Sequence, residues 1–156
     1  MSGKLQAEIR QKRPFASPAA EAYLNVLRTA DRLGEAFESV LKPFGLTPTQ
    51  YNVLRILAGA GKAGLSCSEI SERMLTRDPD MTRLLDRLER AGHVTRAREA
   101  RDRRVITVRL APKGRALLAD LQGPAARFER QSLGRLGGKR LKALVGLLEE
   151  ARETVR

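Results

Sequence analysis

The stretch "DMTRLLDRLERAGHVTRAREARDRRVITVRL", residues 80–110, decides the fold of this chain. Nine of its 31 residues are arginine, yet its apolar residues keep first a helical and then a strand spacing. The first half predicts an amphipathic helix, because one apolar stripe recurs at intervals of three and four: Met81, Leu84, Leu85, Leu88 and Ala91. Asp78 is expected to cap this helix, with Pro79 in its first turn, and Gly92 to end it.

After Gly92 the period changes to two. The runs "VTRAR" (94–98) and "RVITVRL" (104–110) flank "EARDR" (99–103), which predicts a half-buried β-hairpin. In the second run, alternate residues are expected to face opposite sides, with Ile106, Val108 and Leu110 on one side and Val105, Thr107 and Arg109 on the other.

Two further helix starts precede this stretch. "LTPTQYNVLRILAGAG" opens with Thr47 and Gln50, and "LSCSEISERML" with Ser66 and Glu69, in each case the spacing of a capping box. Together with the helix before Gly92 they suit a helix-turn-helix, and the basic hairpin that follows makes it a winged helix. The predicted fold class is therefore mainly α with a small β-hairpin wing.

Long helices are predicted on both sides of this lobe. Residues 17–42 carry apolar side chains at helical spacing, and "APKGRALLADLQ" opens another helix at Pro112. Gly123-Pro124 and Gly137-Gly138 interrupt the C-terminal part, and residues 141–151 again have one apolar face. Residues 1–16 are polar, basic and without a period, which predicts a flexible basic arm.

Composition narrows the class of function. Lys and Arg number 30 against 18 Asp and Glu, so the net charge is +12 and the pI is about 11.0, which predicts a polyanionic partner. No apolar run is long enough to span a bilayer and no signal peptide is recognisable, so we expect a cytoplasmic protein without a membrane partner. One cysteine and one histidine cannot alone make a zinc site, and no phosphate loop or nucleophile motif is present. We therefore expect neither an enzyme nor a metal or cofactor.

The helix before Gly92 is the first candidate DNA-binding element. Since its apolar stripe must face the core, its other side is available to a major groove and carries Asp80, Thr82, Arg83, Asp86, Arg87 and Arg90. Arginine can bind guanine or phosphate, and Asp80 can accept from cytosine or favour the helix dipole. The alternative is a solvated charged face.

The hairpin is the second candidate. Residues 94–115 hold eight basic and two acidic residues, or +6, a charge that favours a phosphate partner over a merely soluble loop. The expected wing contacts are Arg96, Arg98, Arg101, Asp102, Arg103 and Arg104. Arg103 or Arg104 at the tip is expected to enter a minor groove, with Asp102 holding a neighbouring guanidinium.

The sequence resembles the MarR family of bacterial transcription regulators. The resemblance rests on "MTRLLDRLERAGHVTR", on "DRR" with "VITVRL", and on "LAPKG" where the family usually has Leu-Thr-x-x-Gly. It implies a homodimer on a pseudo-palindromic double-stranded DNA operator, a single domain over 17–156 with dimerisation helices at 17–42 and 112–156, and a winged lobe at 47–111. Such regulators are usually repressors released by small phenolic or lipophilic effectors. On this chain the implied ligand pocket comprises Leu27, Asp31, Phe37, Tyr51, Leu54 and Arg55.

The sequence departs from the family pattern at two places. Ala111 replaces the usual Thr, which removes a hydroxyl cap worth about 1 kcal/mol. Gly123-Pro124 interrupts what is normally a continuous helix, so a kink or break is expected there. His93 stands where the family tends to have an apolar residue, and a partly buried histidine without a pH or metal role is the expectation.

Two other functions compete with that of a DNA-binding regulator. A basic RNA-binding module would need aromatic stacking platforms, but the chain has six aromatic residues and none in 80–110. A redox-responsive regulator would use Cys67, which follows the Ser66 cap at a helix N-terminus that favours a thiolate. The family's usual sensor cysteine lies in the first helix, so an incidental thiol is the simpler reading of Cys67.

Overall fold

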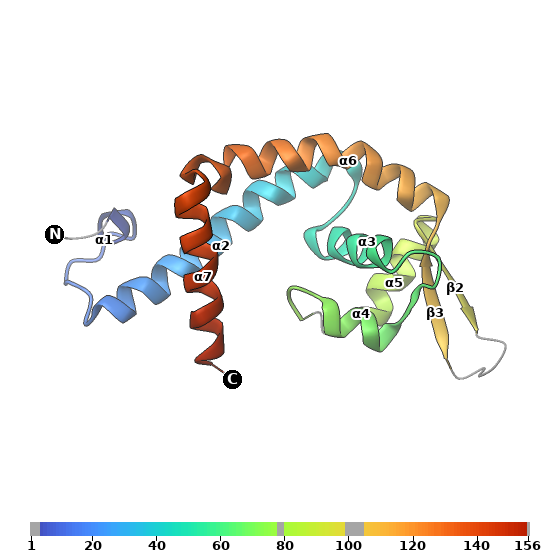
Figure 1. Cartoon of the computed structure of the whole chain (residues 1–156), viewed down its shortest axis with the longest axis horizontal. Helices are drawn as coiled ribbons and strands as arrows, with labels where there is room; N and C mark the ends of the chain where they lie inside the picture. The colour runs from blue at the N-terminus through green and yellow to red at the C-terminus, as the bar shows by residue number, and fades with distance from the viewer. Residues whose placement is uncertain (1–3, 78–79, 99–104, 156) are drawn as a thin grey trace. The chain divides into compact units, whose positions relative to one another are not determined.

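The computed structural model describes residues 4–77, 80–98 and 105–155. Within them the chain is mainly α-helical with one small antiparallel sheet, which confirms the predicted fold class (Figure 1). The chain divides into two compact units, Met1–Phe37 and Glu38–Arg156.

The first unit contains a short helix that the sequence did not indicate. Helix α1 (Lys4–Glu8) buries Leu5, and the carboxylate of Glu8 accepts from Arg28 at 2.8 Å and lies 2.6 Å from Nη2 of Arg32, both on α2 (Pro18–Leu41). The prediction of an arm without regular structure over 1–16 is therefore wrong for Lys4–Glu8. Five residues are too few for a stable isolated helix, so these tertiary contacts hold it.

The helices that lead into the lobe begin as predicted. After the 3-10 helix η1 (Lys42–Phe44) and the left-handed Gly45, helix α3 (Pro48–Ala60) starts with a full capping box between Thr47 and Gln50. Helix α4 (Cys67–Arg73) repeats it with Ser66 and Glu69. In each case two N–H groups that the helix itself cannot satisfy gain a side-chain acceptor.

Helix α5 (Met81–Arg90) has the predicted apolar stripe but a different start. Met81, Leu84, Leu85 and Leu88 are buried. The cap is Asp80, whose Oδ1 accepts from the backbone N–H of Arg83 at 3.0 Å, so the prediction of Asp78 as the cap is wrong. Asp78 and Pro79 lie outside the described residues. Ala91 does not extend the stripe, because it is the exposed C-cap before the left-handed Gly92.

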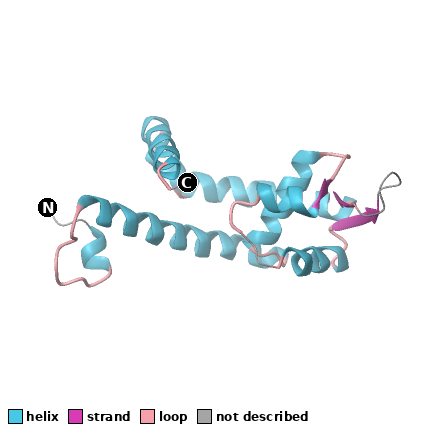
Figure 2. Ribbon diagram, turned by 90° about the horizontal axis from the view of Figure 1, so that it is seen from below, coloured by secondary structure: helices cyan, strands magenta, loops and turns pink. Residues whose placement is uncertain are grey.

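The wing belongs to a three-stranded sheet rather than to a two-stranded hairpin. Strands β2 (Val94–Arg98) and β3 (Ile106–Leu110) pair as predicted, and the short strand β1 (Leu65–Ser66) adds to the other edge of β3, so the order is β1-β3-β2. Figure 2 draws the strands in magenta and the helices in cyan. A strand of two residues has no period for sequence analysis to detect.

The added strand changes which residues of β3 are buried. Val108 and Leu110 are buried as expected, but Ile106 is 43% exposed and Thr107, expected on the other face, is 8% exposed. The chain beside β1 closes over Thr107: a Cβ at Gly64 would lie 2.9 Å from Cγ2 of Thr107. Gly64 also has φ +71°, so glycine suits this approach for two reasons.

Helix α6 (Pro112–Gln131) runs through Gly123-Pro124 without a break, so the expectation of a break there is wrong, whereas a kink at Pro124 stays a prediction. A proline disfavours helical backbone in the preceding residue through a clash with its Cβ, and Gly123 has none. The second expected interruption is confirmed: α6 gives way to the 3-10 helix η2 (Leu133–Leu136), and α7 (Gly138–Glu153) follows the left-handed Gly137. Ala111 caps α6 without a side-chain bond, as predicted.

The core of the second unit joins the lobe to the start of α6. Its fully buried side chains include Leu41, Leu54, Leu57, Ile70, Leu85, Leu88, Val108 and Leu121. At the junction, Gly114 of α6 lies so close to the lobe that a Cβ there would be 2.2 Å from the carbonyl oxygen of His93, and Nζ of Lys113 donates to the carbonyl of Ala91 at 2.8 Å. The first turn of α6 is thus packed directly onto the α5–β2 junction.

Across the part of the chain that the structure describes, no helix is both long enough and apolar enough to cross a membrane.

Candidate nucleic-acid interface

The outward side of α5 is basic. With the Met81–Leu88 stripe in the core, the side chains of Thr82, Arg83, Arg87 and Arg90 are exposed. The acidic residues of the helix are placed differently, because Asp86 and Glu89 are half-buried. The arrangement leaves three arginines on the face that a helix-turn-helix presents to a major groove.

Asp80 serves the helix rather than standing free. One carboxylate oxygen caps α5 through the N–H of Arg83, and the other lies 3.7 Å from Nε of the same arginine. The Arg83 side chain is nevertheless 73% exposed. A capping carboxylate is already engaged, so the arginines and Thr82 carry the available hydrogen-bonding groups of this face.

Arg96 was expected as a wing contact, and the structure gives it a different set of partners. Its Nη2 lies 2.5 Å from Oδ1 of Asp86 and 2.6 Å from Oε2 of Glu89, and its Nε donates to Glu89 at 2.9 Å. The hydrogen bonds that Arg96 donates to Glu89, and secondarily to Asp86, raise the pKa of Arg96. The side chain is 25% exposed, which is far less than Arg83. We refer to Arg96, Asp86 and Glu89 as the β2–α5 clamp.

The remaining basic residues of the hairpin region divide into two groups. Arg98 is exposed on β2, whereas three others bond to backbone carbonyls: Arg109 to Lys62 at 3.2 Å, Lys113 to Ala91 at 2.8 Å and Arg115 to Leu110 at 3.5 Å. Part of the positive charge counted over 94–115 is therefore engaged in hydrogen bonds to the protein's own backbone. The predicted tip contacts Arg101, Asp102, Arg103 and Arg104 lie outside the described residues.

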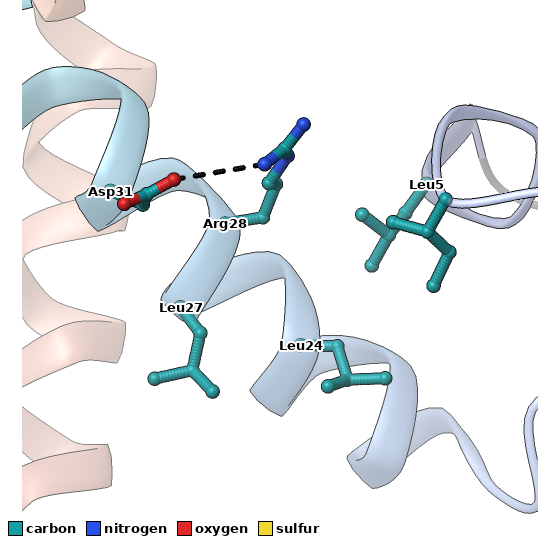
Figure 3. Close-up of a pocket in the computed structure, with 6 residues that line it drawn as sticks. Leu5, Leu24, Leu27, Arg28 and Asp31 are labelled. Atoms are coloured by element: carbon teal, nitrogen blue, oxygen red, sulfur yellow. Dashed lines mark ion pairs between the residues drawn. The ribbon is translucent and has the colours of Figure 1, made fainter. Parts of the chain in front are cut away.

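A shallow groove of about 430 Å³ lies in the first unit, between α1 and α2. Leu5, Ile9, Leu24 and Leu27 give it apolar walls, and Arg28 and Asp31, 3.6 Å apart, stand at its polar side (Figure 3). Two residues of the predicted ligand pocket, Leu27 and Asp31, are thus brought together here. Sequence analysis missed the walls from Leu5 and Ile9, because both lie in a segment read as irregular.

The other four predicted pocket residues do not line this groove. Leu54 is fully buried in the core of the second unit, which makes it a packing residue. Phe37 and Tyr51 are half-buried, and Arg55 is exposed.

The structure also describes the surroundings of Cys67 and His93. Cys67 is a free, half-buried thiol at the first position of α4. His93 follows Gly92 and is partly buried, and its buried Nδ1 has no hydrogen-bond partner among the residues that the structure describes. Burial, and secondarily the positive charge of Lys113, lower the pKa of His93.

The chain is similar to proteins of one family. The family model described as "MarR family" matches residues 44–105, which span α3 to the hairpin. A MarR transcription factor from Planctomyces limnophilus, of known crystal structure, is 38% identical, with 86% of this chain covering 98% of that one at a TM-score of 0.68. The chain belongs to the MarR family.

Two further relatives of this MarR-family chain are named regulators. It is 41% identical over 92 residues to the transcriptional regulator TtmR of Methylorubrum extorquens, a match that covers 59% of this chain but only 46% of TtmR. It is 29% identical to the homoprotocatechuate degradative operon repressor of Escherichia coli, over 73% of this chain and 76% of that protein.

Proposed function

We propose that this MarR-family chain is a transcription regulator that binds double-stranded DNA as a homodimer, most simply as a repressor. The observation that carries the proposal is the outward face of α5, where Arg83, Arg87 and Arg90 are exposed while Asp86 and Glu89 are paired with Arg96. An exposed row of arginines on the second helix of a helix-turn-helix is suited to phosphates and guanine edges. The net charge of +12 supports the same partner.

The apolar faces of the outer helices support a dimer. On α2, Tyr23 is 64% exposed and Val26 and Leu27 are each 49% exposed, although all three belong to one helical stripe. Helix α7 has no buried residue, and Val145, on the same side of the helix as Leu141 and Leu148, is 48% exposed. Apolar surface of this extent on two helices favours an interface with a second copy. We accordingly propose 17–42 and 112–156 as dimerisation segments around a DNA-binding lobe at 47–111.

Binding to a duplex can be tested directly. Fluorescence anisotropy with a labelled duplex from upstream of the protein's own gene is compared with single-stranded RNA of the same length, each over a salt series. Preferential duplex binding with a steep loss of affinity as salt rises is expected, since each neutralised phosphate contributes a slope of about −0.9. Preferential binding of the RNA would favour the alternative of an RNA-binding module.

The wing is tested separately, because its tip lies outside the described residues. The Arg103→Ala, Arg104→Ala double variant is expected to lose duplex binding while it stays dimeric. Unchanged affinity would contradict a role of the tip in binding.

An effector site in the α1–α2 groove is the second element of the proposal. Four apolar walls beside an arginine and a carboxylate suit a small lipophilic molecule with one polar group, such as a phenol. A thermal-shift screen is the measurement, because a ligand at 100 times its dissociation constant adds about 2.7 kcal/mol to stability. Leu24→Glu is expected to abolish the shift of any phenolic hit, and a shift that survives it would place the ligand elsewhere.

A redox role for Cys67 stays a prediction with a simple test. If the thiol senses oxidants, peroxide should weaken duplex binding by the wild-type protein and leave Cys67→Ser unaffected. Equal binding before and after treatment would dismiss the idea.

A further inference from the structure

The β2–α5 clamp joins the two elements that the proposed function assigns to DNA. Asp86 and Glu89 are three residues apart on α5 and so lie on the same side of the helix. Arg96 is on β2, where its backbone pairs with Val108 of β3. One guanidinium therefore bridges the recognition helix and the base of the wing at distances of 2.5 to 2.9 Å.

The hydrogen bonds of Arg96 leave it poorly suited to read DNA. A guanidinium has five N–H donors, and a bidentate contact uses either the Nε/Nη2 edge or the Nη1/Nη2 edge. The first edge is occupied by Glu89, and Nη2 of the second is engaged by Asp86. A bidentate contact with guanine or phosphate would require Arg96 to leave one of these carboxylates half-buried and unpaired.

The clamp also sets the charge that α5 presents. The helix holds three arginines and two acids, which is +1 for the helix alone. Arg96 pairs with both acids, so Arg83, Arg87 and Arg90 face outward without two free carboxylates beside them. Without Arg96, Asp86 and Glu89 would repel each other and any approaching phosphate.

Resting on the proposed function, we infer that Arg96 is a positioning residue for DNA binding: it fixes the wing to the recognition helix and neutralises Asp86 and Glu89, and it makes no phosphate contact itself. Arg98, two positions further along β2 and exposed, is the matched comparison, because its side chain is available to a phosphate.

The test is duplex binding over a salt series for wild type, Arg96→Ala, Arg98→Ala and the triple variant Asp86→Asn, Glu89→Gln, Arg96→Ala. Arg96→Ala is expected to bind at least tenfold more weakly with an unchanged salt slope. The triple variant should recover at least threefold of that loss, because the unpaired carboxylates are gone. Arg98→Ala should reduce the salt slope by about 1.8 for a dimer that loses two phosphate contacts.

A reduced salt slope in Arg96→Ala, with no recovery in the triple variant, would overturn the inference and make Arg96 a DNA contact. Urea unfolding of the same variants supplies a readout without DNA, in which Arg96→Ala should be less stable than the triple variant. If the wild-type protein binds no duplex, the proposed function fails. The unfolding order then still decides whether the clamp exists, and equal stabilities would overturn it too. Circular dichroism confirms that each variant is folded.

Discussion

Replacement of Gly114 by alanine is the most direct test of how α6 is attached to the lobe. The added Cβ would lie 2.2 Å from the carbonyl oxygen of His93 and 2.8 Å from Cδ1 of Leu110. Real Cβ atoms essentially never come closer than 3.0 Å, so the backbone at His93 or the first turn of α6 must move by at least 0.8 Å, the difference between 3.0 and 2.2 Å. The same oxygen accepts a hydrogen bond from the N–H of Ala111 at 2.9 Å, and the movement strains it.

The size of the effect follows from three contributions. Overpacking a tight contact costs about 1–3 kcal/mol, and weakening a backbone hydrogen bond costs about 0.5–1.5 kcal/mol. Alanine in a helix recovers about 1 kcal/mol relative to glycine. The net expectation for Gly114→Ala is a loss of about 0.5–3.5 kcal/mol, which lowers Tm by about 1–14 °C for a chain of this length.

The measurement is urea and thermal unfolding by circular dichroism at one fixed protein concentration, because a dimer makes stability concentration-dependent. Gly59→Ala is the matched control: Gly59 is exposed in α3 and a Cβ there meets nothing within 4 Å, so the same substitution should be neutral or stabilise by up to about 1 kcal/mol. If Gly114→Ala proved as stable as Gly59→Ala, the close packing of α6 on the lobe would be refuted.

Three further outcomes are expected. Asp80→Ala should destabilise by about 1 kcal/mol through loss of the α5 cap, whereas Asp80→Asn should change little; equal losses in urea unfolding would mean that capping is not the role. Burial and Lys113 lower the pKa of His93 below 6.5 in the folded state, so its contribution to stability is fully present above about pH 6.5 and is lost as the pH falls through the folded pKa. His93→Phe should therefore make the free energy of unfolding depend less on pH between about pH 7 and 5. An unchanged pH dependence would assign the loss to other groups. Val145→Asp should shift the protein toward monomer in light scattering, while Ala143→Asp on the opposite side of α7 should not, and a dimer in both would move the interface away from this face.

The elements with strong local signals were predictable from the sequence. The capping boxes at Thr47 and Ser66, the buried stripe of α5 and the left-handed Gly92 all follow from spacing and side-chain chemistry that act within a few residues. The basic outward face of α5 follows from the same stripe, because burying one side of a helix exposes the other.

What could not be predicted depends on contacts between distant segments. The two residues of β1 form a strand only because β3 is beside them, and Lys4–Glu8 form a helix through Arg28 and Arg32. Arg96 carried a sequence signal, since two acids three residues apart precede an arginine on the next element, but charge counting treats it like any other cation. At Gly123-Pro124 the proline predicts an interruption, but the glycine before it removes the part of the clash that a Cβ would make.

The close contact between the first turn of α6 and the α5–β2 junction has a consequence for motion. This first turn is fixed at Gly114 and Lys113, and the whole helix is 20 residues without a break, which at 1.5 Å per residue is about 30 Å long. If a straight helix of this length tilts by about 5° about its C-terminal end, its N-terminal end moves by about 2.6 Å, roughly half the pitch of an α-helix. A movement of the first turn of α6 therefore acts directly on the end of α5, because Lys113 and Gly114 contact the residues that follow that helix.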